Sequence, residues 1–469
     1  MKKAIHNSLK DIEEGYNTHS ILYNADFAWP IIRLKVNEEI RKKEGLKSRT
    51  FKLNWFLFHK LLRSLFFGLS NLFRLRQFSF WIFSSSDRRK LINSKYVDRV
   101  AGSFAINYPK SLIIENPYPL GRHYKYKNLG NGKVLGQTVF FAATKIISLF
   151  LKKPRIENEE VLVKILAENH INLDYNKILK ETRAQYFLMK FLLRFTKPKA
   201  VFFVYSASSM GYIKALKELN IPVIELQHGV INSSHHAYNL YRDFGYTLFP
   251  DYLLTYGPKE LDVFNRSNYF IDPAHVFPVG YYFLEATSKF AITEEFEQQL
   301  RRQYKMIVAF SLQDPFETFT FEFLKKTAAL NPSICYLLVP RKADKTFPDI
   351  ERLENMYIER RMNIYECLKI ADFHATINST CAIESLFFGV PNVLYDFKNW
   401  ASDYYGEILN DPGHTVFVSS PLEFIETLEQ HRFYSKKVIG DKSESFIKRN
   451  FDENLKHLLD ELVLTRVNE

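Results

Sequence analysis

Cysteine is scarce in this chain, with Cys335, Cys367 and Cys381 among 469 residues. Their spacing fits neither a disulfide framework nor a cysteine-based metal site, and it suits a reducing compartment. Glycine and proline are sparse too, at 17 and 18 residues, which argues against low-complexity sequence. Uncharged runs stay below the ~18 residues that a membrane-spanning helix needs, and the first residues mix acids with bases, unlike a signal peptide. We therefore expect a cytoplasmic protein, with peripheral attachment to the inner face of the cytoplasmic membrane as a further hypothesis.

Several motifs that identify enzyme classes are missing from the sequence. It has no Gly-x-x-x-x-Gly-Lys-Ser/Thr loop and no Gly-x-Gly-x-x-Gly turn, which argues against a P-loop hydrolase and a dinucleotide oxidoreductase. The Gly-x-Ser-x-Gly elbow of serine hydrolases is missing as well. So is an Asp-x-Asp turn, and we expect neither a bound metal ion nor a cofactor.

Aromatic and basic residues are abundant, with 42 Phe, 27 Tyr and a net charge of +12. Residues 51–155 hold 19 Lys and Arg against 3 Asp and Glu, so +16 lies there and the rest of the chain sums to −4. Within this block, residues 58–76 place an apolar stripe opposite Lys60, Arg63 and Arg74. The stripe indicates either a helix that covers a sheet or a basic amphipathic helix on anionic lipid. The charge favours an anionic partner, and we expect a membrane surface rather than nucleic acid.

Residues 201–229 predict a strand, a helix and a second strand. Residues 201–205 form a continuous apolar run, and residues 212–219 carry apolar side chains at helical spacing. A second apolar run, 222–226, leads into Gln227-His228-Gly229. Strand–helix–strand units build parallel sheets, in which functional residues follow the carboxyl ends of the strands. His228 is therefore a candidate site residue.

The same alternation of strands and helices continues to the end of the chain and predicts an α/β protein. A polar, charged segment at 285–304 is the expected linker. It divides the chain into an N-terminal Rossmann-like domain, 1–284, and a C-terminal one, 305–469, whose last helix is able to pack back on the first. We expect the two domains to face one another across a cleft.

The most specific motif lies in the second half, where an apolar strand ends in Asn378-Ser379-Thr380 and a helix follows. Hydroxyls and free N–H groups at a helix start suit a diphosphate. Glu384 lies one turn further on, where a carboxylate can accept hydrogen bonds from ribose hydroxyls. Ordinary helix capping by Ser379 or Thr380 is the alternative.

These motifs resemble a family of enzymes. The turn at 378–384, the Gly389-Val390-Pro391 that ends its helix and the upstream Gln227-His228-Gly229 are similar to glycosyltransferases of the GT-B architecture, in particular the bacterial capsule, lipopolysaccharide and teichoic-acid enzymes. The resemblance covers about residues 200–396. It implies that the C-terminal domain binds a nucleotide-sugar, with the turn on the diphosphate and Glu384 on the ribose. It also implies that His228 is the general base.

Further candidates on the donor side come from the ends of other predicted strands. Ser311 and Gln313 close the first strand of the second half and would face the cleft. Arg341 and Lys342 follow the next strand, where positive charge can hold a leaving phosphate in place of a metal ion. A solvated surface pair is the alternative for these two residues.

The acceptor-side candidates belong to the first half. Asp87 and Arg88 occupy a polar turn after a strand and could contact an acceptor, with Asp87 as an alternative base. Gln227 precedes His228, and His236 follows in a polar loop. A metal site made of His228, His235 and His236 would lack a carboxylate or thiolate partner.

The sequence thus favours a metal-independent glycosyltransferase that moves a sugar from a nucleotide-sugar to a surface polysaccharide or lipid-linked glycan. Three alternatives stay open: a polyol-phosphate transferase of the teichoic-acid type, a nucleotide-sugar epimerase, and a non-catalytic scaffold of the same fold that binds glycan or nucleic acid.

Overall fold

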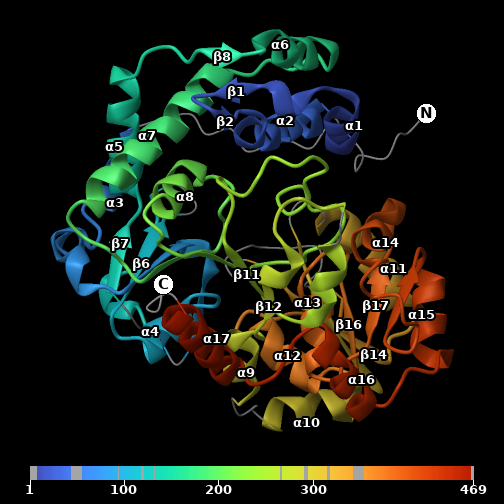
Figure 1. Ribbon diagram of the computed structural model, residues 1–469. Coiled ribbons are helices and arrows are strands. Elements are labelled where there is room, and N and C mark those ends of the chain that lie inside the picture. The colour runs from blue at the N-terminus through green and yellow to red at the C-terminus, as the bar shows by residue number, and fades with distance from the viewer. Residues whose placement is uncertain are drawn as a thin grey trace. The chain divides into compact units, whose positions relative to one another are not determined.

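The computed structural model describes residues 8–43, 55–92, 94–117, 121–130, 133–264, 267–289, 294–313, 317–341 and 353–465 (Figure 1). The chain forms two compact units. Unit 1 comprises the chain up to Thr255, Leu261–Phe277 and the residues from Lys456 onward. Unit 2 comprises Tyr256–Glu260 and Pro278–Leu455. The polar segment 285–304 falls within unit 2, where helices α9 (Tyr282–Ser288) and α10 (Glu294–Gln303) form.

Unit 1 is built on one sheet, to which seven strands contribute among the described residues. Its order is β12 (Val276–Pro278), β11 (Tyr252–Thr255), β10 (Val223–Leu226), β9 (Ala200–Phe203), β3 (Phe80–Ser85), β6 (Ser111–Asn116) and β7 (Lys133–Gly136). The strands from β11 to β7 pair in parallel. All four residues of β9 and of β10 are buried, as expected for strands covered on both faces. The predicted strand–helix–strand unit at 201–229 is confirmed.

One face of this sheet is covered by α5 (Thr138–Phe150), α7 (Tyr175–Leu193), α8 (Met210–Lys217) and the 3₁₀ segment η2 (Leu69–Gln77). The core between them includes Trp81, Phe83 and Phe203 from the strands. Gly211 allows α8 to approach α7 closely, because a Cβ there would lie 2.0 Å from the Thr182 carbonyl oxygen. Helix packing of this kind needs a residue without a side chain at the contact.

The single helix predicted for residues 58–76 is wrong. Helix α3 (Trp55–Leu65) ends before Gly68, whose φ of +65° is left-handed, and η2 begins directly after it. A Cβ at Gly68 would lie 1.8 Å from the Val134 carbonyl oxygen. The apolar spacing therefore survives in both pieces, while the close approach to β7 breaks the helix between them.

The remaining elements of unit 1 are short or lie at the start of the chain. They are α1 (Ser8–Gly15), α2 (Trp29–Lys43), α6 (Glu159–Glu168), α4 (Gly102–Asn107), the small sheet of β1 (Leu22–Tyr23), β2 (Asp26–Phe27) and β8 (Ile156–Glu157), and the hairpin of β4 (Arg89–Ile92) and β5 (Lys95–Asp98). The 3₁₀ turn η3 (Ser86–Arg88) joins β3 to this hairpin.

Unit 2 has its own parallel sheet, with six strands among the described residues. Its order is β15 (Met356–Ile358), β14 (Ile334–Val339), β13 (Met306–Ser311), β16 (Phe373–Ala375), β17 (Asn392–Tyr395) and β18 (Thr415–Val418). Its helices include α11 (Glu317–Leu330), α12 (Ile364–Ile370), α13 (Cys381–Phe387), α14 (Trp400–Tyr405), α15 (Pro421–Gln430) and α16 (Lys436–Lys442). Helix α17 (Phe451–Thr465) begins in unit 2, and its residues from Lys456 onward belong to unit 1. Phe310, Leu324 and Phe424 are among the buried residues of the core between α11, α15 and the sheet.

Both sheets share one topology. Numbered in chain order within each unit, the strands run 3-2-1-4-5-6, and unit 1 adds a seventh at the edge. This is the doubly wound Rossmann order. The predicted fold class, α/β with two Rossmann-like units, is therefore confirmed. Within the described part of the chain, helices with the length and apolar character needed to cross a bilayer are not found.

Candidate functional site

The reversal of strand order marks one position in each unit where ligands bind in doubly wound sheets. In unit 1 it lies between β3 and β9, and in unit 2 between β13 and β16. Asp87 and Arg88 follow β3, and Ser311 closes β13. The turn at 378–380 follows β16. These residues therefore belong to loops next to the two switch points, whereas His228 follows β10 and Arg341 follows β14.

His228 follows β10 directly, and the loop after β3 reaches it. Arg88 Nη1 donates a hydrogen bond of 3.2 Å to the His228 carbonyl oxygen. Because β9 lies between β3 and β10 in the sheet, the two loops meet across the end of β9, the strand beside the switch point. The ring of Tyr205, in the loop after β9, lies edge-on to the imidazole at 5.8 Å. Three consecutive loops of the sheet thus surround His228.

The imidazole of His228 is neutral at pH 7. Burial lowers its pKa well below the usual value, and the positive charge of Arg88 lowers it further, while a hydrogen bond with the Val204 backbone opposes both. Its Nδ1 lies 3.4 Å from the Tyr238 hydroxyl oxygen. A neutral ring is the form that can accept a proton.

Behind His228 lies a buried carboxylic acid that the sequence analysis did not single out. Tyr238 donates a 2.7 Å hydrogen bond to Glu225 Oε1, and Ser206 also hydrogen-bonds to Glu225. Burial raises the pKa of Glu225 to about 7, against the opposing effect of these hydrogen bonds. The sequence signal was the one acidic residue within the apolar strand Val223–Leu226.

The other acceptor-side candidates have different surroundings. Asp87 is exposed in η3. Gln227 is buried, and its Nε2 donates a 2.9 Å hydrogen bond to the Gly229 carbonyl within the same turn. The carbonyl of the buried His236 accepts a 2.5 Å hydrogen bond from Arg33, whose Nε is paired with Glu13 at 2.6 Å. The main chain of His236 therefore anchors the N-terminal helices, and an acceptor contact at these positions stays a prediction.

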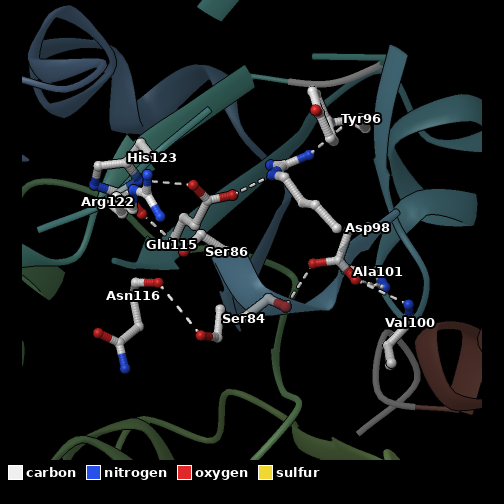
Figure 2. A network of polar contacts seen from close by, with 12 residues as sticks. Ser84, Ser86, Tyr96, Asp98, Val100, Ala101, Glu115, Asn116, Arg122 and His123 are labelled. Atoms are coloured by element: carbon white, nitrogen blue, oxygen red, sulfur yellow. Dashed lines mark hydrogen bonds and ion pairs between the residues drawn. The ribbon is translucent and has the colours of Figure 1, made fainter. Parts of the chain in front are cut away.

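A second polar network lies at the carboxyl ends of β3 and β6 (Figure 2). Glu115, at the end of β6, is fully buried and forms an ion pair with the buried Arg89. His123 Nδ1 lies 2.7 Å from the other oxygen of Glu115. Removal of one partner from such a buried pair typically costs about 3–5 kcal/mol, so the network holds the loops after both strands in place.

The turn after β3 is fixed by further hydrogen bonds that Figure 2 shows. Ser84 donates a hydrogen bond of 2.6 Å to Asp98 Oδ2, and Asp98 Oδ1 accepts hydrogen bonds from the N–H groups of Val100 and Ala101. The Ser86 hydroxyl donates 2.9 Å to the Arg122 carbonyl. These contacts position η3, which carries Asp87 and Arg88.

One chain of contacts resembles a catalytic triad in its order of groups. It runs from the Ser64 hydroxyl, as in a nucleophile, through His123, as in a base, to Glu115, as in an acid that orients the base. Ser64 Oγ lies 2.7 Å from His123 Nε2. However, Ser64 is 1% exposed and is also 2.5 Å from the Thr138 hydroxyl. Since a nucleophile must reach its substrate, this chain of contacts is structural and ties α3 to the ends of β6 and β7.

In unit 2, Ser311 is held by a buried network below the switch point. Its Oγ lies 2.9 Å from His374 Nε2, and His374 Nδ1 lies 2.7 Å from Asn392 Oδ1. The Thr376 hydroxyl donates a hydrogen bond of 2.9 Å to the Ser311 carbonyl oxygen. Burial lowers the pKa of His374 to about 4. The hydroxyl of Ser311 therefore joins β13 to β16, and a direct donor contact by Ser311 stays a prediction.

The predicted diphosphate turn has one feature that favours a ligand. Ser379 Oγ accepts a 3.3 Å hydrogen bond from the Cys381 N–H, and the Ser379 carbonyl accepts one from Tyr405. Asn378 and Thr380 are half-buried. Glu384 is 2% exposed, and its Oε2 has no hydrogen-bond partner among the described residues. A buried carboxylate oxygen without a donor is costly, so a ligand hydroxyl there would be stabilising.

The remaining donor-side candidates have no described contact with the turn at 378–380 or with Glu384. Gln313 is half-buried after β13, and Arg341 is exposed after β14. Lys342 lies outside the described residues. The structure shows no contact that joins Gln313 or Arg341 to Glu384 within the part of the chain that it describes, and their roles stay predictions.

No protein-family model and no curated protein matches this chain. Similar solved structures include UDP-GlcNAc 2-epimerase from Neisseria meningitidis bound to UDP-GlcNAc, with 12% identity, 82% of this chain and 99% of that chain covered, and a TM-score of 0.44. The wall teichoic acid polymerase TagF is 12% identical, and the match covers 89% of this chain and 100% of TagF, with a TM-score of 0.44. The glycotransferase of kitacinnamycin has 11% identity, coverage of 82% and 99%, and a TM-score of 0.47. Similarity at this level concerns the fold at most, and the function must be argued from the chain's own residues.

Proposed function

We propose that this protein is a glycosyltransferase that moves a sugar from a nucleotide-sugar to a hydroxyl of a surface-polysaccharide or lipid-linked glycan. The observation that carries the proposal is the neutral imidazole of His228 at the switch point of unit 1, next to Arg88. We assign the donor to unit 2, where Glu384 has a buried oxygen to offer to ribose hydroxyls.

The reaction needs a proton acceptor and a stabilised leaving group. The acceptor hydroxyl attacks the anomeric carbon, its proton passes to His228, and the bond from the sugar to the diphosphate breaks. We assign the proton to Nε2, the ring nitrogen that does not face Tyr238. The resulting imidazolium would be compensated through Tyr238 by Glu225, whose pKa of about 7 leaves it about half ionised at neutral pH.

The leaving diphosphate requires positive groups. Because the sequence has no Asp-x-Asp turn, we assign its neutralisation to protein groups rather than to a metal ion. Arg341 is exposed and follows β14, and Lys342 is its neighbour in sequence. Asn378, Ser379 and Thr380 would supply N–H and hydroxyl donors.

Replacement of His228 tests the base. His228→Ala should lower turnover by about 10²–10⁴-fold and leave nucleotide affinity unchanged, since a general base acts on the chemical step. The matched control is His275→Ala, an exposed histidine of the same unit, which should have wild-type turnover. Near-normal turnover in a folded His228→Ala enzyme would refute the assignment.

Replacement of Glu384 tests the donor site. Glu384→Gln should weaken nucleotide-sugar binding by roughly 1–1.5 kcal/mol, measured by calorimetry, because a neutral amide oxygen replaces the charged acceptor. It should not destabilise the ligand-free protein, since the carboxylate oxygen it removes is buried and unpaired there. Glu426→Gln, on the exposed face of α15, is the control. Unchanged affinity would remove Glu384 from the site.

The products separate this function from its rivals. A glycosyltransferase releases a nucleoside diphosphate when an acceptor is present. A polyol-phosphate transferase releases a nucleoside monophosphate, and an epimerase converts its substrate without any acceptor. A non-catalytic scaffold would turn over none of these substrates.

A further inference from the structure

The outer surface of four neighbouring segments of unit 1 is unusually apolar. Trp55 is 74% exposed, Leu149 78%, and Phe73 and Phe150 each 83%. The exposed large apolar side chains of this surface, called here the aromatic face, are Trp55, Phe58, Leu62 and Phe66 in and after α3, Phe73 in η2, Phe141, Ile146, Leu149 and Phe150 in α5, and Phe187, Phe191 and Phe195 in and after α7. Single exposed apolar residues are ordinary, but a cluster of this size marks an interaction site.

These four segments pack on one another. Helix α5 contacts both α3 and α7, and Figure 1 shows the three helices side by side. Arg76 in η2 donates a 2.6 Å hydrogen bond to the carbonyl of Phe195, just after α7. The exposed apolar residues of the aromatic face therefore belong to elements that pack beside one another.

The helices are apolar on two sides. Their inner residues, including Phe140 in α5 and Leu188 and Met189 in α7, belong to the core over the sheet. Phe187 and Phe191 in α7 are exposed on the opposite side. An amphipathic helix normally buries its apolar side and exposes polar residues, so large apolar side chains on the outer side favour a cover there.

The charge around this face is mostly positive. The segments 55–77, 138–155 and 186–199 each contain four Lys or Arg residues and no Asp or Glu. Lys145 pairs with Glu181, and Lys190 pairs with Glu218 at 3.0 Å. Exposed basic residues on the same segments also include Arg63, Arg74, Lys152, Lys153 and Arg194.

We propose that the aromatic face docks the protein on an anionic lipid surface. Large aromatic side chains next to Lys and Arg are the composition of interfacial membrane segments, in which rings enter the boundary region and cations meet lipid phosphates. The charge complementarity favours a lipid surface over a second copy of the chain, because two copies would bring basic residues together. This inference goes beyond the transferase activity and stands independently of it.

Sedimentation with vesicles tests the inference on the full chain. The protein should bind vesicles of phosphatidylcholine with phosphatidylglycerol, bind pure phosphatidylcholine far more weakly, and be released as salt rises. Replacement of Lys152 and Lys153 by Glu should lower partitioning at least about 25-fold, because each basic residue near an anionic surface contributes a factor of about five. Phe150→Ser should lower it roughly tenfold through lost apolar burial.

Matched controls lie in unit 2. Lys436 and Lys437 form another exposed pair of neighbouring lysines, and Leu422 is 58% exposed. The corresponding double Glu variant and Leu422→Ser should bind vesicles like the wild type. Equal partitioning into neutral and anionic vesicles would overturn the inference. So would a dimer in analytical ultracentrifugation that Phe150→Ser disrupts in a protein that does not bind vesicles.

Discussion

The hydrogen bond from Tyr238 to Glu225 gives a prediction with a distinctive pH dependence. Glu225 is buried with a pKa of about 7, and the 2.7 Å hydrogen bond from Tyr238 favours its ionised form. Tyr238→Phe removes that donor, so the pKa of Glu225 should rise further. Each unit of this rise adds about 1.4 kcal/mol to the cost of the ionised form.

The destabilisation should therefore grow with pH. At about pH 5.5 Glu225 is protonated in both proteins. The variant should then lose only the stability that a neutral hydrogen bond contributes, about 0.5–1.5 kcal/mol. At about pH 8.5 the wild-type carboxylate is ionised, and the loss should reach about 1.5–3 kcal/mol. In the unfolded chain Glu225 ionises at the same pH in both proteins, so this contribution cancels in the comparison.

The direction in which wild-type stability changes with pH follows from the same pKa of Glu225. Since the folded pKa of Glu225 lies above its unfolded value, its contribution to stability falls by about 3 kcal/mol as pH rises from about 4.5 to about 7. His235, whose pKa is lowered to about 4 by burial, acts in the opposite direction over a similar range. The difference between variant and wild type is therefore the quantity to measure.

Urea unfolding followed by tryptophan fluorescence is the assay, because Trp29, Trp55 and Trp81 belong to unit 1. Tyr212→Phe is the matched control. That tyrosine is equally buried, and its hydroxyl lies 3.1 Å from the neutral Thr144 hydroxyl. Its replacement should cost about 0.5–1.5 kcal/mol at either pH. The reasoning fails if Tyr238→Phe costs the same at both pH values.

Three further predictions concern packing and buried charge. Gly211→Ala should destabilise unit 1 by about 1–3 kcal/mol in urea unfolding, because its Cβ would lie 2.0 Å from the Thr182 carbonyl; an unchanged midpoint would contradict this. His374, with its folded pKa of about 4 below the unfolded value, should contribute stability above about pH 6.5 that is lost by up to about 3 kcal/mol as pH falls to about 4. His374→Gln should remove this part of the pH slope, and an unaltered slope would show that other groups cause it. Arg89→Met should cost about 3–5 kcal/mol in thermal or urea unfolding, since Glu115 is left buried without its cation, and a loss below about 1 kcal/mol would contradict the pairing.

Local sequence pattern was enough to predict the strand–helix–strand unit at the centre of the first sheet. The apolar runs at 201–205 and 222–226 are strands β9 and β10, and residues 212–219 overlap α8. Strands buried on both faces leave an unbroken apolar run, which can be recognised without any knowledge of partners. Local pattern failed at 58–76, where the helix ends because Gly68 must pass close to β7, a contact far away in sequence.

The site was predictable in part for the same reason. The position of His228 after a strand was predictable because it follows an apolar run and precedes a glycine, and both features are local; its role in a site stays a prediction. Glu225 and Tyr238 were missed, although an acidic residue within an apolar strand is itself a signal of a buried polar contact. Their partnership is set by the fold of the loop 227–238 back onto β10.

The sequence by itself determined the fold class, the strands at 201–205 and 222–226 and the basic, aromatic character of residues 51–155, because periodicity, burial and charge are properties of neighbouring residues. The tertiary structure decided the strand order, which brings the loops of Arg88 and His228 together across 140 residues of chain. It also decided that α5 packs beside both α3 and α7, which lie far from one another in sequence. Such arrangements depend on hydrogen bonds and packing between distant segments, and these arise only when the sheet has formed.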